Sequence, residues 1–224
     1  MPERTDIPDD VAPHWTSSAL VTVDVQRDTL DGGALEIAGT SRALDAMAGL
    51  VRAFRGARRP IVHVVRLYLP DGSNAEPVRR AVIAGGGPML QPGGEGSQLA
   101  APLLPDPSVE LDHARLLAGG LQHLGDDEVV LYKPRWGAFY GTALDAHLHD
   151  LGVDTVVVCG ANFPNCPRAT IYEASERDLR IVVAEDALSG LYPKGADELR
   201  AIGVVLMSAA AVADGLGAGA GATP

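Results

Sequence analysis

Short runs of β-branched and apolar residues alternate with longer amphipathic segments along most of this chain. The apolar runs have the length and composition of buried strands, and they occupy residues 19–24, 60–66, 128–132, 154–160, 180–185 and 204–207. Apolar positions recur at helical spacing between these runs, which predicts helices over residues 41–55, 142–151 and 194–201 and a further helix directly after Cys166. This alternation predicts an α/β protein with three α-β-α layers and a mostly parallel, six-stranded sheet.

Three segments lack this pattern. Residues up to about 17 are rich in Pro and Asp, which predicts a flexible N-terminal arm. Residues 69–127 are broken by Gly and Pro, and we expect short helices that wrap around the domain. The Gly/Ala-rich C-terminal tail, residues 215–224, is expected to be disordered. No linker divides the chain, so we expect a single domain over residues 1–224 with a core at about 18–213.

Charge and cysteine usage narrow the possible partners. The net charge of −11 repels phosphate backbones and anionic lipids, so we expect a small-molecule substrate and neither nucleic acid nor membrane as a partner. The apolar run 204–212 is too short to cross a bilayer, and the N-terminus has no apolar signal-peptide core. The two cysteines form neither a disulfide framework nor a C-x-x-C motif. These features predict a cytoplasmic protein.

Cys166 stands where a strand gives way to a helix. The strand ends at Gly160, a short loop follows, and Pro167 suits the first position of the next helix, which places Cys166 at the N-cap. The positive end of the helix dipole favours an anion there, so we expect a lowered thiol pKa and a nucleophilic cysteine. The alternative is a cysteine that only packs, which is our interpretation of Cys159 inside the strand.

An acid and a base follow other strands of the predicted sheet. Asp24 ends the first strand, and Lys133 follows the third. Parallel strands bring their carboxyl ends to one edge, where ligands bind, so these residues and Cys166 should meet there. Asp24 then suits the role of proton acceptor, and Lys133 that of its partner or of a charge that favours the thiolate. Each has an ordinary alternative, since Asp often caps turns and Lys is usually solvated.

The backbone of the turn completes this arrangement. The N–H groups of Asn162 and Cys166 are candidates to hold the oxyanion that forms when a thiol attacks a carbonyl. The expected chemistry is acyl transfer through a thioester.

Three sequence blocks resemble the isochorismatase-like cysteine hydrolases, the superfamily that includes nicotinamidase and N-carbamoylsarcosine amidohydrolase. The blocks are VTVDVQRDTLDGGALEI, YKPRWGAFYGTALDAHLHDLGVDTVVVCG continued by ANFPNCPRAT, and RIVVAEDALSG, and the resemblance extends over residues 19–207. It implies a Rossmann-like, isochorismatase-type hydrolase fold and cysteine-dependent hydrolysis of an amide, ureido or carbamoyl C–N bond. Asp24, Lys133 and Cys166 match the catalytic residues of the family. The resemblance also implies a homo-oligomer, dimer or tetramer, and a cis peptide between Ala161 and Asn162 that turns the Asn162 N–H into the oxyanion site.

The chain departs from the family pattern at two places. Many members have Thr or Ser where this chain has Phe163, which is followed by Pro164 and Asn165. Phe163 either changes the pocket or packs behind it, and an occluded thiol would make the chain a non-catalytic, ligand-binding member. Nicotinamidase-like members carry a metal-binding Asp-x-His after the second strand, where this chain reads RLYLPD, so we expect no metal and no cofactor.

Further residues are candidates for substrate binding. Trp136, Phe139 and Tyr140 follow Lys133 and would form an apolar pocket wall, or else pack in the core. Arg168 would bind a substrate carboxylate in a bidentate manner, or else form a salt bridge with Glu173 or another acid. His63 lies within a strand and is expected to be a satisfied core or edge residue rather than a metal ligand.

Overall fold

The computed structural model describes residues 7–220 and is built on a seven-stranded sheet in the order β3-β4-β2-β1-β5-β6-β7. All neighbouring strands are parallel except β3 and β4, so the predicted α/β class is confirmed. The strands are β1 Ser18–Val23, β2 Ile61–Val65, β3 Gln122–Gly125, β4 Glu128–Tyr132, β5 Thr155–Gly160, β6 Arg180–Leu188 and β7 Val205–Met207. The six predicted strands are all present. The additional strand, β3, has the short and mostly polar sequence QHLG, which gives no apolar run to detect.

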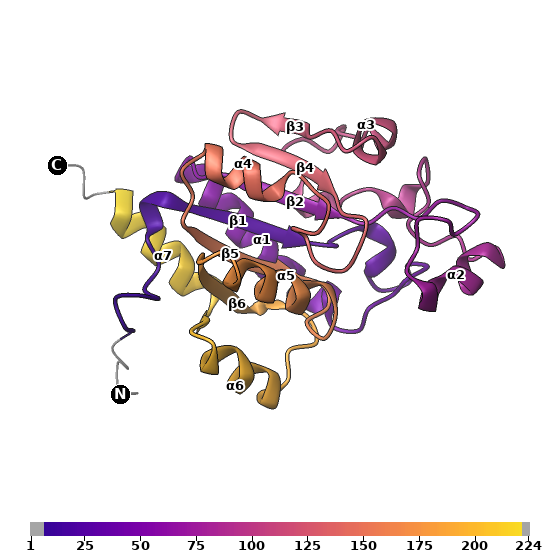
Figure 1. Cartoon of the computed structure of the whole chain (residues 1–224). Helices are drawn as coiled ribbons and strands as arrows, with labels where there is room; N and C mark the ends of the chain where they lie inside the picture. The colour runs from indigo at the N-terminus through magenta and orange to yellow at the C-terminus, as the bar shows by residue number, and fades with distance from the viewer. Residues whose placement is uncertain (1–6, 221–224) are drawn as a thin grey trace.

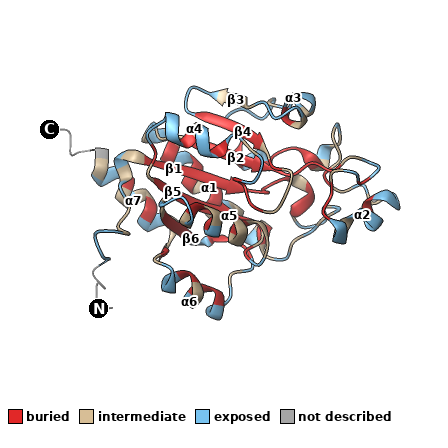
Figure 2. Ribbon diagram, viewed as in Figure 1, coloured by how far each residue is buried: buried red, intermediate tan, exposed pale blue. Residues whose placement is uncertain are grey.

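The central strands are buried on both faces, as near-continuous apolar runs require (Figure 2). Val21 of β1 lies opposite Val62 of β2 on one side and Val158 of β5 on the other. At the end of β5, Gly160 has φ of 126°, and a Cβ atom there would lie 2.2 Å from the carbonyl oxygen of Val23. Only glycine therefore allows β1 and β5 to stay paired as far as the edge where the site is built.

Helices cover both faces of the sheet (Figure 1). Helices α1 (Thr40–Gly56) and α7 (Ala209–Ala220) pack on one face, where Met47, Leu50 and Phe54 are fully buried. Helices α4 (Leu144–Asp150), α5 (Cys166–Ser175) and α6 (Pro193–Ala201) contribute to the core on the other face. The helices that were predicted over these regions are confirmed with shifts of one or two residues at their ends.

Both predicted flexible ends are more ordered than expected within the described residues. Residues 215–220 of the tail belong to α7, where a Cβ atom at Gly215 would lie 2.4 Å from the Trp15 ring. The short 3-10 helix η1 (Trp15–Ser17) thus fits against glycines that composition alone marked as disorder. In the arm, the Nδ1 atom of His14 lies 2.6 Å from Oδ2 of Asp154. The rest of both predictions, at residues 1–6 and 221–224, lies outside the described residues.

The segment between β2 and β4 holds short helices, as predicted. These are α2 (Pro77–Ala84), η3 (Glu95–Ser97), η4 (Ala101–Leu103) and α3 (His113–Leu117), while η2 (Arg27–Thr29) lies after β1. Helix α2 projects beyond the carboxyl edge of the sheet (Figure 1). It is anchored by a small apolar cluster in which Ile83 packs with Tyr68, Ala75 and Leu90.

The fold bears on two further expectations, the absence of a membrane span and the formation of an oligomer. Within residues 7–220, no helix combines the length and hydropathy that crossing a bilayer requires. Val212, in the apolar segment that gave slight support to an oligomer, is fully buried against the chain's own core. The homo-oligomer therefore stays a prediction, which light scattering can test.

Candidate active site

Asp24, Lys133 and Cys166 come from three separate segments and meet at the carboxyl edge of the sheet. Asp24 follows β1, Lys133 follows β4, and Cys166 opens α5 after the loop that leaves β5. Within the sheet, β2 and β4 lie to one side of β1, and β5, β6 and β7 lie to the other side of it. The connection that follows β1 and the connection that leads to β5 therefore run in opposite directions. Adjacent parallel strands whose connections run in opposite directions leave a crevice between them, which is the usual ligand site of such sheets.

Asp24 and Lys133 form a buried ion pair. The Nζ atom of Lys133 lies 2.9 Å from Oδ2 of Asp24, and the two side chains are 0% and 8% exposed. Burial lowers the pKa of Lys133, but the negative charge of Asp24 outweighs this effect and raises it, so the lysine stays charged. Asp24 also has φ of 54°, a left-handed conformation that is uncommon for a residue other than glycine. Such strain is typical of residues whose position serves a function.

The polar atoms of this pair are incompletely satisfied. Within the described residues, Oδ1 of Asp24 and Nζ of Lys133 make no contact with hydrogen-bond geometry, although the ion pair itself is close. Buried polar atoms normally have partners, because leaving them without one costs roughly 1–3 kcal/mol each. The carboxylate therefore has an unused acceptor position.

Cys166 is half-buried, and its thiol is held in the protonated form. Burial, and then the Asp24 carboxylate, raise the pKa of Cys166 to about 12, while Lys133 opposes them in part. The predicted lowering of this pKa is therefore wrong, because desolvation and a neighbouring negative charge outweigh the helix dipole. The predicted N-cap is also displaced by one residue, since Asn165 is the N-cap and Cys166 is the first helical residue.

The loop before Cys166 contains no cis peptide bond. Every peptide bond described between residues 7 and 220 is trans, so the prediction for Ala161–Asn162 is wrong. The trans form is favoured by about 2.5–4 kcal/mol at non-proline residues. The trans loop also satisfies its own backbone, because Ala161 N donates to Val23 O at 2.9 Å and Phe163 N donates to Ser189 O at 2.8 Å.

Two backbone N–H groups of this loop make no hydrogen bond to another protein group within residues 7–220. In the described part of the chain, the backbone N–H groups of Asn162 and Cys166 donate to no other protein group. For Cys166 the reason is its place at the start of α5, where the first N–H groups have no acceptor within the helix. These are the two donors that the sequence indicated for an oxyanion.

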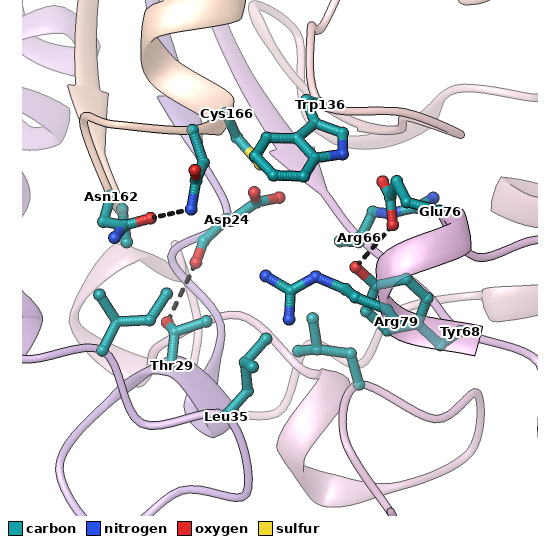
Figure 3. A pocket seen from close by; sticks show the side chains of 14 residues that line it. Asp24, Thr29, Leu35, Arg66, Tyr68, Glu76, Arg79, Trp136, Asn162 and Cys166 are labelled. Atoms are coloured by element: carbon teal, nitrogen blue, oxygen red, sulfur yellow. Dashed lines mark hydrogen bonds and ion pairs between the residues drawn. The ribbon is translucent and has the colours of Figure 1, made fainter. Parts of the chain in front are cut away.

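A small cavity opens beside the three residues (Figure 3). Its volume is about 30 Å³, which holds only about one or two water molecules. Asp24, Asn162 and Cys166 line one side, and Trp136 lies next to the thiol. Of the five residues predicted to bind substrate, Trp136 alone borders this cavity.

The other aromatic candidates lie elsewhere. Phe139 is 4% exposed and packs in the core under the guanidinium of Arg177, whereas the Tyr140 side chain is 60% exposed to solvent. Phe163 is fully buried and lies edge-on to Tyr192, with ring centroids 5.5 Å apart. Phe163 therefore belongs to the hydrophobic core between sheet and helices, and it does not line the cavity.

Arg168 does not reach the cavity either. Its Nη2 atom lies 2.7 Å from Oε2 of Glu198, and its Nη1 donates to the Tyr192 hydroxyl at 2.8 Å. The predicted role in binding a substrate carboxylate is therefore wrong, and the salt-bridge alternative holds with Glu198 as the acid. Arg168 cannot point toward the cavity because it lies on the side of α5 that faces α6.

The opposite wall of the cavity was missed by the sequence analysis. Arg66 and Tyr68 follow β2, and Glu76 and Arg79 come from the start of α2. The carboxyl-edge rule that identified Asp24 would also have indicated Arg66 and Tyr68, because they follow a neighbouring strand. No comparable signal marks Arg79, since the fold of residues 69–127 was not readable from the sequence.

Arg66 is locked in place by its neighbours. Its Nη2 atom lies 3.0 Å from Oε1 of Glu76, and its guanidinium lies 4.5 Å from the centre of the Tyr68 ring. Its Nη1 also donates to the Lys133 carbonyl oxygen at 2.8 Å. Its own charge is therefore neutralised by Glu76.

Histidines and acids do not assemble into a metal site in the described residues, where no group of three potential ligands occurs. His63 is fully buried, with Nδ1 2.8 Å from the Thr22 hydroxyl and Nε2 2.9 Å from Oε1 of Glu128. The interpretation of His63 as a satisfied core residue is confirmed. Cys159 is likewise fully buried, and burial raises its pKa to about 12.

Comparisons with known proteins agree with this architecture. The family model for the isochorismatase domain matches residues 18–211. Maleamate amidohydrolase of Pseudomonas putida is 30% identical over 173 residues, which cover 76% of this chain and 71% of that protein. A probable inactive nicotinamidase of Arabidopsis thaliana is 26% identical over 188 residues, which cover 82% of this chain and 86% of that protein. The crystal structure of an isochorismatase family protein from Desulfovibrio vulgaris superposes with a TM-score of 0.76 at 32% identity, covering 90% of this chain and 98% of that chain.

Proposed function

Because the chain belongs to the isochorismatase family, we propose that it is a cysteine-dependent hydrolase of a C–N bond in a small amide, ureido or carbamoyl compound. The observation that carries this proposal is the convergence of Asp24, Lys133 and Cys166 beside one cavity. A carboxylate with an unused acceptor position lies beside a protonated thiol, and the buried ammonium of Lys133 lies 2.9 Å from that carboxylate. The amidohydrolase named among the relatives supports the same class of bond.

The first half of the reaction forms a thioester. Asp24 accepts the thiol proton while the Cys166 sulfur attacks the substrate carbonyl carbon. The carbonyl oxygen becomes an oxyanion, which accepts hydrogen bonds from the free N–H groups of Asn162 and Cys166. Asp24 then passes the proton to the nitrogen, the C–N bond breaks, and ammonia or an amine leaves.

The second half releases the acid. Asp24, again a carboxylate, takes a proton from a water molecule that attacks the thioester carbonyl. The carbon–sulfur bond breaks, the thiol regains a proton, and the carboxylic acid product departs. Lys133 remains charged throughout and stabilises the negative charge that passes between the carboxylate, the sulfur and the oxyanion.

A non-catalytic, ligand-binding member of the same fold is the alternative. Phe163 no longer supports it, because that side chain is buried in the core and does not line the cavity. Two observations favour it instead: the cavity of about 30 Å³ is smaller than a substrate, and one relative is named a probable inactive nicotinamidase. Slow alkylation of Cys166 would not support this alternative, because a protonated thiol reacts slowly even in an active enzyme.

Turnover decides between the two functions. Purified protein is incubated with a panel of small amides, ureas and carbamoylated acids, and ammonia release is measured. Cys166→Ala should reduce the rate to background while the melting temperature stays within a few degrees of the wild type. Cys159→Ala is the matched control, since that buried thiol lies away from the cavity, and it should retain activity. An undiminished rate in Cys166→Ala would remove the mechanism.

A further inference from the structure

The charges around the cavity are paired except for one. Asp24 is neutralised by Lys133 at 2.9 Å, and Glu76 by Arg66 at 3.0 Å. Arg79 also lines the cavity, yet no acid in the described part of the chain lies within ion-pair distance of its guanidinium. The site therefore carries one unbalanced positive charge in a protein whose net charge is −11.

Arg79 extends into the site and not away from it. In Figure 3 its guanidinium projects from α2 toward the centre of the cavity, facing Asp24 and the side of Trp136. The residue is half-buried, and its side chain donates no hydrogen bond to a protein group within residues 7–220. A guanidinium offers five donors in a planar fork, which matches a carboxylate in a bidentate pair. Its hydrogen-bonding capacity is thus available to a ligand.

Arg79 and Trp136 separate this cavity from a larger hollow on the surface. The outer hollow has a volume of about 320 Å³ and is also lined by Val78, Val82 and Met89. Ligand pockets usually begin at about 300 Å³, so the outer hollow has the size of a binding site and the inner cavity does not. Val78 is 74% exposed and Val82 is 56% exposed, and these apolar side chains give the hollow an apolar wall beside the guanidinium.

We propose that Arg79 binds a carboxylate of the substrate, so that the preferred substrate is a short acid amide or carbamoylated acid with an anionic end. This inference rests on the proposed function. The scissile carbonyl lies at Cys166, and the carboxylate lies at the far end of the molecule, paired with Arg79. When the substrate enters, the Arg79 guanidinium moves out of the inner cavity. The inner cavity and the outer hollow then form one continuous pocket. An amide without a carboxylate leaves the Arg79 charge unpaired beside the bound substrate, which costs binding energy.

The test compares a charged and an uncharged substrate of the same shape. Maleamate carries a carboxylate, and maleamide replaces this group with a second amide. We expect wild-type kcat/KM to be at least about 30-fold higher for maleamate, since a charge-assisted bidentate pair is the stronger contact. Arg79→Gln should lower kcat/KM for maleamate by about 100-fold, mainly through KM, with a much smaller effect on maleamide.

A matched control lies next in the sequence. Arg80 is on the same helix but is exposed, and its Nε donates to the Ala75 carbonyl oxygen at 3.0 Å. Arg80→Gln removes the same charge from α2 without touching the cavity, so it should leave the preference for maleamate unchanged. Equal losses in the two variants would show a general charge effect and overturn the assignment of Arg79.

The two proposals fail in distinguishable ways. If the wild type hydrolyses maleamide as well as maleamate, and Arg79→Gln changes neither rate, the hydrolase stands and the carboxylate site is wrong. If neither compound is hydrolysed, calorimetry with maleate still tests the anion site. Binding of maleate that is weakened at least about tenfold in Arg79→Gln but not in Arg80→Gln would then support it. Equal binding by both variants, or no binding by the wild type, would overturn it.

Discussion

Strand β4 carries a buried charge cluster at each end, and the two clusters differ in how completely they are satisfied. At the amino end, Glu128 accepts from Nε and Nη2 of Arg55, both at 2.7 Å, and lies 2.9 Å from Nε2 of His63. At the carboxyl end, Lys133 and Asp24 are 2.9 Å apart, but one atom of each has no partner with hydrogen-bond geometry among the described residues.

The difference separates a structural from a chemical use of buried charge. A saturated network fixes the structure and has no capacity left for a ligand, whereas an incomplete one retains donors and acceptors at a cost in stability. We therefore expect changes at Glu128 to affect stability and changes at Asp24 to affect turnover.

Replacement of the proposed base should have the largest effect. Asp24→Asn keeps the size of the side chain but removes the proton acceptor, so kcat/KM should fall by about 10³-fold or more. The Asp24 carboxylate raises the pKa of Cys166, whereas Lys133 lowers it. Removal of the carboxylate should therefore make Cys166 react faster with iodoacetamide, which peptide mapping can measure. Loss of turnover without faster alkylation would contradict the coupling between the two groups.

Replacement of Glu128, the acid at the amino end of β4, should lower the stability of the fold and leave the rate of the reaction unchanged. Burial alone raises the pKa of Glu128, but its bonds to Arg55 and His63 outweigh burial and lower the pKa from 4.5 to about 2. This shift corresponds to about 3 kcal/mol of stability, which is present above pH 4.5 and is lost as pH falls toward 2. Glu128→Gln should lose about that amount at pH 7.

Denaturant unfolding at several pH values measures this effect. In the wild type, the free energy of unfolding should decline between pH 4.5 and 2, and Glu128→Gln should flatten this decline because the titrating group is gone. Its kcat should stay within about threefold of the wild type. A large fall in kcat would show that the two ends of β4 are coupled.

A conservative change within the saturated cluster should have a smaller effect. Arg55→Lys preserves the charge but replaces a planar fork with a single ammonium, so one of the two bonds to Glu128 is lost. We expect a loss of about 1 kcal/mol in the free energy of unfolding, with unchanged turnover. Chemical denaturation of the variant beside the wild type gives this value. An unchanged free energy of unfolding would mean that the bidentate geometry contributes little to stability.

The smallest effect should be that of alkaline pH on the reaction. Burial and Asp24 raise the pKa of Cys166 to about 12, and the pKa of Lys133 is raised above its ordinary value of 10.5. Neither group titrates between pH 7 and 9, so kcat/KM should vary by less than about twofold in that range. A tenfold rise per pH unit would indicate a thiolate that forms before substrate binds, as the dipole at the helix start alone would favour.

The parts of the site that sequence analysis predicted correctly are those that follow directly from strand positions. Asp24 and Lys133 were located because each follows an apolar run, and parallel strands end at one edge. The sequence left open whether Phe139 and Phe163 line the pocket or pack in the core, and whether Arg168 binds substrate or forms a salt bridge. Neighbours in sequence say which segment carries a side chain but not which way it points. One turn of α5 decides that Arg168 meets Glu198, and the packing of α6 decides that Phe163 is buried.

Gly-rich segments were misread for a related reason. Glycines at 215–219 indicated disorder by composition, but here they let Trp15 approach α7. The pairing depends on two segments about 200 residues apart, and no local pattern records it.

From the sequence we could predict the class of fold, the places of six strands along the chain, and the edge of the sheet at which Asp24, Lys133 and Cys166 lie, while the resemblance of three sequence blocks indicated the family. Local patterns suffice for these features, because apolar runs, helical periodicity and the direction of parallel strands are properties of short segments. The protonation state of Cys166, the burial of Phe163 and the presence of Arg79 in the cavity became apparent only from the folded structure. Desolvation, charge balance and side-chain direction depend on groups that are distant in the chain, so they exist only once the chain has folded.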